Sequence, residues 1–214
     1  MLENTLYLLL AYLVGSAPFG YLAGKLNGID LREHGSKNIG ATNTIRVLGK
    51  KWGIPVFICD VLKGLLPVFL MKQHLGVELT GCTTAEMGWL IGTLVAAVLG
   101  HTFTCFLKFK GGKGIATALG ALIAFSPFIA GVALAVWLAC MVCTRYVSLS
   151  SIMAAVGVEV AILWQCLSDG AANAADAVAI GFISVLVVLV IVKHRSNVTR
   201  LLNGTEPKAF SKKK

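Results

Sequence analysis

Charged residues are scarce in this sequence. Asp, Glu, Lys and Arg together make up 14% of its 214 residues, whereas soluble globular domains carry about a quarter. Hydrophobic residues make up 57%, and the mean hydropathy is +0.80. The apolar residues also occur in runs close to the roughly 20 residues that a helix needs to cross a bilayer. The composition therefore excludes a soluble domain and indicates a polytopic helical membrane protein.

The apolar runs also lack the alternation of polar and apolar residues that the strands of a membrane β-barrel need. Residues 185–192, for example, are apolar at every position. The segment Met1–Asn4 lacks the positive charge of a signal peptide, and no cleavage site follows it, so we expect a retained first span. We predict an all-α integral membrane protein that forms a single domain over residues 1–214.

Several chemical signatures are missing as well. No His pairs with Cys or an acid at metal-ligand spacing, so we expect no metal and no cofactor. The sequence contains no Walker A pattern, which leaves nucleotide binding poorly supported. Five of the six cysteines lie in or beside apolar runs, which favours packing over a disulfide framework. The net charge of +9 is better explained by the cytoplasmic side of a membrane protein than by a nucleic-acid partner.

Seven segments are expected to cross the membrane. The run over 115–143 is too long for one helix, and Ser126-Pro127 divides it, because proline is tolerated at the start of a helix. The fourth segment is short and would need shielding by protein or local thinning of the bilayer. The expected spans are approximately 5–24, 53–71, 87–106, 115–125, 128–144, 151–167 and 177–193.

The basic residues agree with seven spans. With that count, the loop 25–51, the turn 107–114, Arg145 and the tail 194–214 lie on one face, and together with Lys193 at the adjoining end of the last span they contain 17 of the 19 Lys and Arg residues. The opposite loops carry acids. Their acidic residues are Glu3, Glu78, Glu86, Asp169 and Asp176. By the positive-inside rule, the N-terminus is expected outside and the C-terminus in the cytoplasm.

The turn Phe109-Lys110-Gly111-Gly112-Lys113-Gly114 is the strongest candidate site. Glycine exposes backbone N–H groups, lysine adds positive charge, and the start of the next helix favours an anion. This pattern predicts a phosphate site. A tight reversal on the positive side of the membrane explains the same residues equally well, and spacing alone leaves both interpretations open.

The loop Gly35–Asn43, followed by Arg46, is a second candidate. It is long and rich in small hydrogen-bonding residues, and an arginine can hold phosphate through two parallel hydrogen bonds. The alternative is an ordinary polar connector. Within this loop we expect Ser36, Asn38, Thr42 and Asn43 to contribute to the site.

Two further polar segments precede or follow predicted spans. Ser148 and Ser151 stand at the start of the sixth span, where they could bind phosphate or merely cap the helix. His194 and Asn197 follow the seventh span three residues apart, so a continuing helix would place both on one face. Glu206 is the lone acid of the tail, and we expect it to pair with an Arg or Lys.

Charges inside the predicted spans are costly in lipid and should be paired. Asp60 and Lys63 lie three residues apart in the second span, which predicts an intramembrane ion pair. Glu159 in the sixth span should form a hydrogen bond between helices or be protonated.

Taken together, these motifs resemble the bacterial acyl-phosphate:glycerol-3-phosphate acyltransferases, the PlsY family. The resemblance covers essentially the whole chain, and Lys37 is one departure, because the family commonly has glycine there. The motifs that carry it are Gly15-Ser16-x-Pro18-x-Gly20, Asp30-Leu31-Arg32, Gly35-Ser36-x-Asn38-x-Gly40-Ala41-Thr42-Asn43 with Arg46, Asp60-x-x-Lys63-Gly64, Gly100-His101, Phe109-Lys110-Gly111-Gly112-Lys113-Gly114, and His194-Arg195-x-Asn197 with Gly204-x-Glu206.

The resemblance implies a seven-helix enzyme of the bacterial inner membrane with its active site facing the cytoplasm. It would transfer a fatty acyl group from acyl phosphate to the 1-hydroxyl of sn-glycerol 3-phosphate, giving lysophosphatidic acid and phosphate. Its partners would be these two substrates and membrane lipid. The resemblance implies that Ser36, Arg46, His194 and Asn197 are required for activity, that Lys113 acts with them, and that Glu206 is structural. Lys110, Gly111, Gly112, Gly114, Ser148 and Ser151 would bind substrate.

The residues agree with this chemistry. Two phosphate-bearing substrates need two anion sites, and acyl phosphate is already activated, so positioning and charge stabilisation could suffice. The sequence lacks the H-x-x-x-x-D dyad of acyl-CoA-dependent enzymes. Either His194 or a substrate phosphate could accept the hydroxyl proton. The competing class is an anion channel or phosphate carrier that uses the same basic loops.

Overall fold

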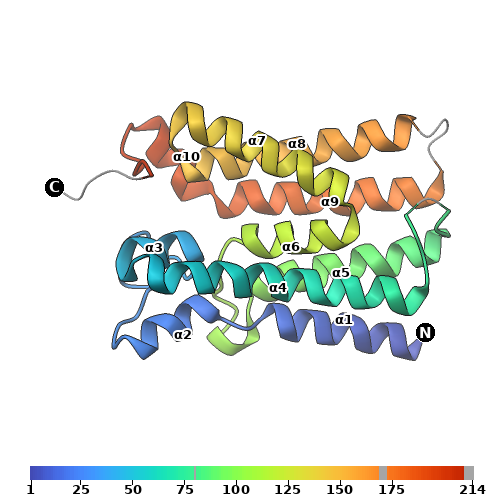
Figure 1. Cartoon of the computed structure of the whole chain (residues 1–214), viewed down its shortest axis with the longest axis horizontal. Coiled ribbons are helices and arrows are strands. Elements are labelled where there is room, and N and C mark those ends of the chain that lie inside the picture. Colours follow the sequence, from blue (N-terminus) through green and yellow to red (C-terminus); the bar gives the residue numbers. More distant parts are fainter. Residues whose placement is uncertain (80, 169–172, 210–214) are drawn as a thin grey trace. The chain divides into compact units, whose positions relative to one another are not determined.

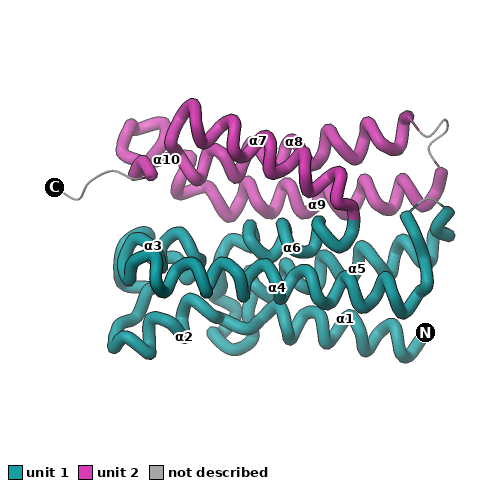
Figure 2. Tube along the Cα trace, in the orientation of Figure 1, with its two compact units in different colours: residues 1–125 teal, residues 126–214 magenta. Residues whose placement is uncertain are grey.

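The computed structural model describes residues 1–79, 81–168 and 173–209, and these residues form helices and connecting segments without any strand. Asp169, which the sequence places in an outer loop, and residues 210–214 of the tail lie outside the described residues. The chain forms two compact units, residues 1–125 and residues 126–214, which Figure 2 shows in different colours. Each unit is described by itself.

Unit 1 contains six α-helices and one 3-10 turn among its described residues. In Figure 1, α4 runs beside α5 and α6, and α2 and α3 lie at the end of the unit where α4 begins. The elements are α1 (Leu2–Gly15), α2 (Phe19–Leu26), α3 (Ala41–Leu48), α4 (Lys50–Leu75), α5 (Thr84–Thr102), η1 (Cys105–Leu107) and α6 (Ile115–Phe125).

Unit 2 is simpler over its described residues. Three long helices lie side by side, and a short fourth helix follows the end of α9 (Figure 1). These are α7 (Pro127–Thr144), α8 (Val147–Ser168), α9 (Ala174–Lys193) and α10 (Arg195–Leu202). Ser126 caps α7 by accepting a hydrogen bond from the Ile129 N–H group, and Pro127 is the first residue of the helix, as the sequence predicts.

Six helical stretches within the described residues are long and apolar enough to cross a membrane. They are Leu2–Leu26, Lys50–Leu75, Thr84–Leu107, Pro127–Thr144, Val147–Ser168 and Ala174–Lys193. Each of the six longer spans expected from the sequence therefore corresponds to a helical stretch that could cross a membrane. The seventh, α6, has the predicted bounds but only 11 residues, so a seventh crossing stays a prediction.

Two local features differ from the sequence-based expectation. The first span is not one continuous helix, because α1 ends at Gly15 and α2 begins only at Phe19, after Pro18. Proline restricts the residue before it and has no N–H group to donate, so a break at this point follows from the sequence. The loop 25–51 also contains the short helix α3, which starts after Gly40.

Glycines bring the helices of unit 1 into close contact. A Cβ atom on Gly15 would collide with the backbone of Ala97 in α5, and one on Gly64 would collide with the Thr117 carbonyl in α6. Gly120 of α6 faces the Val61 carbonyl of α4 in the same way. Small residues that allow backbones to approach are typical of helix packing in membranes. The contact between α4 and α6 therefore depends on positions 64 and 120 remaining glycine.

Polar side chains join the break between α1 and α2 to the rest of unit 1. The Lys63 ammonium donates to the Ala17 carbonyl at 2.7 Å, and the Thr104 hydroxyl donates to the Ser16 carbonyl at 2.6 Å. Tyr12 donates to the Phe103 carbonyl at 2.7 Å. Backbone carbonyls freed by a helix break inside a membrane need such partners. The break is therefore a fixed feature of the fold.

Within unit 2, the predicted role of Glu159 as a link between helices is confirmed. The Ser184 hydroxyl of α9 donates to Glu159 Oε1 of α8 at 2.6 Å. This hydrogen bond joins two helices that are each long and apolar enough to cross a membrane.

We expect Gly64→Ala to reduce the free energy of unfolding by about 1–3 kcal/mol, the usual cost of overpacking. The added methyl group would meet backbone atoms of α6, which cannot rotate away. Thermal unfolding of the purified protein in detergent would measure the loss. Gly88→Ala in α5 is the matched control, because nothing lies within 4 Å of its Cβ position. Equal melting temperatures for the two variants would contradict the prediction.

Candidate active site

Asn43 organises the polar loop that precedes α3. Its side chain is buried, its oxygen accepts a hydrogen bond from the Ser36 N–H group at 2.8 Å, and its amide nitrogen lies 2.8 Å from the Asn38 carbonyl. The same nitrogen reaches the carbonyls of Leu31 at 3.2 Å and His34 at 3.0 Å. One amide side chain therefore replaces a regular hydrogen-bonding pattern over this loop. Its role in the structure is to hold the loop in place.

The other predicted residues of this loop lie around Asn43. Ser36 and Thr42 are exposed, and Arg46 is half-buried on α3. Asn38 accepts a hydrogen bond from the Gly40 N–H group at 2.8 Å, directly before α3 begins. The structure therefore brings Ser36, Asn38 and Asn43 together, with accessible side chains on Ser36 and Thr42.

The glycine-rich turn packs against the end of α5. The Gly111 N–H group donates to the Thr102 carbonyl at 3.2 Å, and the Gly112 N–H group donates to the His101 carbonyl at 3.0 Å. This differs from the expectation that glycine N–H groups in the turn face a phosphate, because these two are occupied by α5. The cause is the end of α5, whose last carbonyls have no partner within the helix. Gly111 and Gly112 therefore shape the turn.

Positive charge near this turn comes from two lysines and the start of α6. Lys110 is exposed, and Lys113 is half-buried two residues before α6 begins at Ile115. Gly114 has φ of +77°, a left-handed conformation that favours glycine and turns the chain into α6. The first N–H groups of a helix have no carbonyl partner within it and carry partial positive charge. Two lysines and one helix start therefore form a positively charged segment.

The predicted ion pair inside unit 1 is confirmed. Lys63 Nζ lies 2.7 Å from Asp60 Oδ1, and both side chains are almost fully buried. His101 of α5 is also buried, and its Nδ1 lies 3.6 Å from the same carboxylate oxygen. Sequence reasoning quoted His101 as part of a motif but gave it no role. Its signal was the Gly100-His101 pair ahead of the glycine-rich turn.

Glu206 accepts hydrogen bonds from three polar side chains of unit 2. Its Oε1 accepts hydrogen bonds from Ser148 at 2.6 Å and from Asn197 at 2.7 Å, and its Oε2 accepts one from Arg200 at 2.7 Å. The predicted pairing of Glu206 with a basic residue is confirmed, and Arg200 is that residue. The sequence alone leaves open which Arg or Lys pairs with Glu206; Arg200 lies on α10 within one turn of Asn197.

His194 occupies the junction between α9 and α10. Its ring is buried, and Nδ1 lies 2.8 Å from the Val190 carbonyl. Because a carbonyl can only accept, Nδ1 carries the proton in the neutral ring, and Nε2 holds the lone pair. The helix restarts at Arg195 instead of continuing through His194, and Asn197 is buried in its first turn.

The two candidate serines of α8, Ser148 and Ser151, already have partners inside unit 2. The Ser148 hydroxyl donates to Glu206, and the Ser151 hydroxyl donates to the Val147 carbonyl at 2.8 Å. A hydroxyl has one proton to donate, so these bonds would have to break before either serine could donate to a phosphate. The structure thus uses both serines internally.

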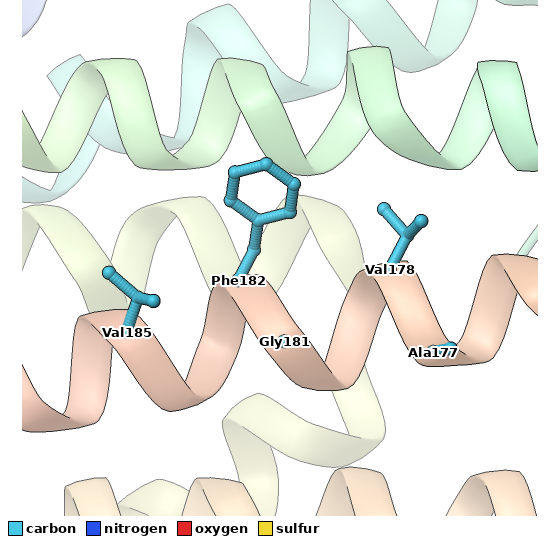
Figure 3. Close-up of a pocket in the computed structure, with 5 residues that line it drawn as sticks. All are labelled: Ala177, Val178, Gly181, Phe182 and Val185. Carbon is cyan, nitrogen blue, oxygen red and sulfur yellow. The ribbon is translucent and has the colours of Figure 1, made fainter.

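Unit 2 also has an open apolar depression along α9. Phe182 and Val185 project from the helix with Val178, as Figure 3 shows, and Ala177 and Gly181 complete the lining. These residues provide neither charge nor a hydrogen-bonding side chain, so the depression cannot recognise a phosphate. Within the described part of the chain, no group of three or more His, Cys, Asp and Glu side chains is placed to hold a metal ion.

The fold and these polar segments define a helical integral membrane protein with cationic and hydrogen-bonding groups at its helix ends. Comparison with known proteins narrows the class. The sequence model of the family described as glycerol-3-phosphate acyltransferase matches residues 5–204. The chain therefore belongs to the glycerol-3-phosphate acyltransferase family.

Individual relatives match over nearly their whole length. The glycerol-3-phosphate acyltransferase of Synechocystis sp. is 45% identical over 209 residues, covering 96% of this chain and 90% of the relative. That of Bacillus cereus strain G9842 is 43% identical over 215 residues, covering 100% and 99%.

Two solved structures also match this chain. Crystal structures of PlsY, an integral membrane glycerol 3-phosphate acyltransferase, in its glycerol 3-phosphate and lysophosphatidic acid forms have TM-scores of 0.83 and 0.80. They are 39% and 38% identical to this chain and cover 96% of it and 95% of their own chains. The recognition of the family from sequence motifs is confirmed.

The hydrogen bonds to Glu206 predict an acid-sensitive unit 2. Burial raises the pKa of this carboxyl, but the hydrogen bonds from Ser148, Asn197 and Arg200 outweigh burial and leave the pKa below its ordinary value of 4.5. A lowered pKa means that the stabilisation is complete above about pH 4.5 and is lost as the pH falls through the folded-state pKa. We therefore expect the melting temperature to decrease as the pH is lowered from 4.5. The variant Glu206→Gln should not show this pH-dependent decrease.

Melting curves of detergent-solubilised protein between pH 3 and 7 would measure the effect. Glu33→Gln, which removes an exposed carboxylate of unit 1, should keep the wild-type profile. An identical acid-induced loss in wild type and Glu206→Gln would contradict the assignment.

Proposed function

We propose that this chain transfers a fatty acyl group from acyl phosphate to the 1-hydroxyl of sn-glycerol 3-phosphate, which gives lysophosphatidic acid and inorganic phosphate. The observation that carries the proposal is the full-length match to glycerol-3-phosphate acyltransferases, two of whose solved forms are named for glycerol 3-phosphate and lysophosphatidic acid. The first is an acyl acceptor, and the second is that acceptor after acylation.

The proposal includes a single domain over residues 1–214 in the bacterial inner membrane. In it, α6 is the seventh crossing, the N-terminus lies outside, and the C-terminus lies in the cytoplasm. The charge distribution supports this topology, because 17 of 19 basic residues then lie on the cytoplasmic side. Membrane lipid surrounds the exposed apolar side chains and supplies the apolar medium for the acyl chain.

The chemical step needs placement more than activation. The glycerol hydroxyl oxygen attacks the acyl carbonyl carbon, the bond from that carbon to the phosphate oxygen breaks, and phosphate leaves with the electron pair. The hydroxyl proton goes to His194 Nε2 or to a phosphate oxygen. His194 can take part because its Nδ1 faces a carbonyl, which leaves the lone pair on Nε2. Phosphate is a good leaving group, so charge stabilisation can carry most of the barrier reduction.

The phosphate groups are assigned to cationic side chains. Lys113 and Lys110, next to the start of α6, and Arg46 on α3 supply positive charge. Gly111, Gly112 and Gly114 hold the turn that carries the lysines. Ser36, Asn38, Thr42 and Asn43 form the loop beside Arg46, and Asn197 acts with His194. Ser148, Ser151 and Glu206 maintain unit 2, while Asp60 and Lys63 maintain unit 1.

A donor comparison tests the proposed reaction. Purified protein in lipid nanodiscs should convert labelled glycerol 3-phosphate to lysophosphatidic acid with a long-chain acyl phosphate and not with the corresponding acyl-CoA. Lys113→Ala should lower kcat/KM by about 10- to 100-fold, the usual cost of losing a charged hydrogen bond to a substrate. Lys51→Ala, which removes an exposed lysine at the start of α4, should behave like wild type.

Product formed with acyl-CoA alone would refute the choice of donor. If neither donor gives product and the protein transports phosphate in proteoliposomes, the protein is a phosphate carrier and not an acyltransferase.

Reporter fusions test the topology. A phosphatase that is active only outside the cytoplasm should be inactive when fused after Lys110 or at the C-terminus, and active when fused after Glu78. The physical reason is that basic segments are retained on the cytoplasmic side. Activity after Lys110 combined with inactivity at the C-terminus would show that α6 does not cross the membrane.

A further inference from the structure

We infer that His101 is a positioning residue for the glycine-rich turn Phe109–Gly114. Its buried imidazole sets how closely the turn packs on α5, and thereby where Lys113 and the start of α6 lie. This inference rests on the proposed function, because it assigns the turn to the binding of a substrate phosphate. The structural part of it stands on contacts within unit 1 alone.

The turn is seated directly on His101. The Gly112 N–H group donates to the His101 carbonyl, and a Cβ atom on Gly112 would collide with Nε2 of the same residue. Gly112 is itself buried. The imidazole therefore occupies the space that any larger residue at position 112 would need. Close packing of this kind transmits a displacement of one group to its neighbour.

The neighbouring contacts extend along the same part of α5. A Cβ atom on Gly111 would collide with the His101 carbonyl oxygen, and one on Gly114 would lie 3.0 Å from Val98 Cγ1 and 3.1 Å from Thr102 Oγ1. The three glycines of the turn thus follow α5 over residues 98–102. Of these contacts, the one at Gly112 is made by the tip of a side chain, and the one at Gly111 is made by backbone.

The opposite side of the His101 ring faces the buried charges of α4. Its Nδ1 lies 3.6 Å from Asp60 Oδ1, the oxygen that pairs with Lys63 at 2.7 Å. His101 is only 5% exposed, so its ring lies inside the packed protein. The ring is thereby fixed between a charged pair on one side and Gly112 on the other. His101 touches no reacting atom in this arrangement and acts through the turn.

The pair of contacts at Gly111 and Gly112 provides a matched test. Gly112→Ala should raise the KM for one of the two phosphate substrates at least tenfold while kcat changes less than threefold, because the turn is displaced and the chemical step is not. His101→Asn keeps a donor near the Nδ1 position and has no atom at the Nε2 position. The double variant His101→Asn/Gly112→Ala should therefore recover most of the lost affinity.

Gly111→Ala is the control, because its added methyl group meets a backbone oxygen that every residue at position 101 retains. His101→Asn should give it no recovery. Separate KM values for glycerol 3-phosphate and for acyl phosphate identify which phosphate the turn holds. Melting temperatures of the same variants should show the same pattern, with recovery at position 112 and none at position 111.

Three outcomes would overturn the inference. They are an equal effect of Gly112→Ala in the wild-type and His101→Asn backgrounds, equal recovery at both glycines, or a loss confined to kcat. If the wild-type protein forms no lysophosphatidic acid, the proposed function fails, and the melting temperatures still decide whether His101 seats the turn. If the wild type is active and recovery at position 112 is absent, the inference alone fails.

Discussion

Lys63 donates to the Ala17 carbonyl while it is paired with Asp60, so one buried ammonium group joins α4 to the break between α1 and α2. A lone charge at this depth would be very costly, and a pair still loses the solvation of both ions. The Ala17 carbonyl at the helix break, which also accepts a hydrogen bond from the Phe19 N–H group, supplies an additional partner for the ammonium. The break and the ion pair therefore stabilise each other. Asp60 also faces His101, which extends the same interaction to the glycine-rich turn.

Gly111 and Gly112 of that turn satisfy backbone groups at the end of α5. Backbone inside a membrane protein must find hydrogen-bond partners within the protein. The turn finds them at the end of α5, where the carbonyls of His101 and Thr102 accept from Gly112 and Gly111. This arrangement requires close approach, and close approach excludes a Cβ at both positions. A glycine-rich, lysine-bearing turn can thus bind an anion through its lysines and the following helix start while its glycines serve packing.

Features encoded in neighbouring residues could be predicted from the sequence, and features that join distant residues could not. The spans follow from the length of the apolar runs, the Asp60–Lys63 pair from a spacing of three residues, and the start of α7 from Ser126-Pro127. The donation from Thr104 to Ser16 and the closure of the first loop around Asn43 have no local signature. The residues of the turn do not predict that the turn's N–H groups will donate hydrogen bonds to carbonyls of α5.

The polar side chains of unit 2 hold one another in fixed positions. Glu206 binds Ser148, Asn197 and Arg200, so a single carboxylate fixes side chains from α8 and α10 before any substrate arrives. Such prior ordering would favour the acyl-phosphate reaction proposed for this chain, because an activated donor needs a held acceptor and compensated charge. The cost of ordering the side chains is then met in folding and not in the reaction. Asn197 is held by Glu206, and His194 is held by the Val190 carbonyl. The structure of unit 2 therefore favours a site that is set by folding, in which the substrates adapt to fixed side chains.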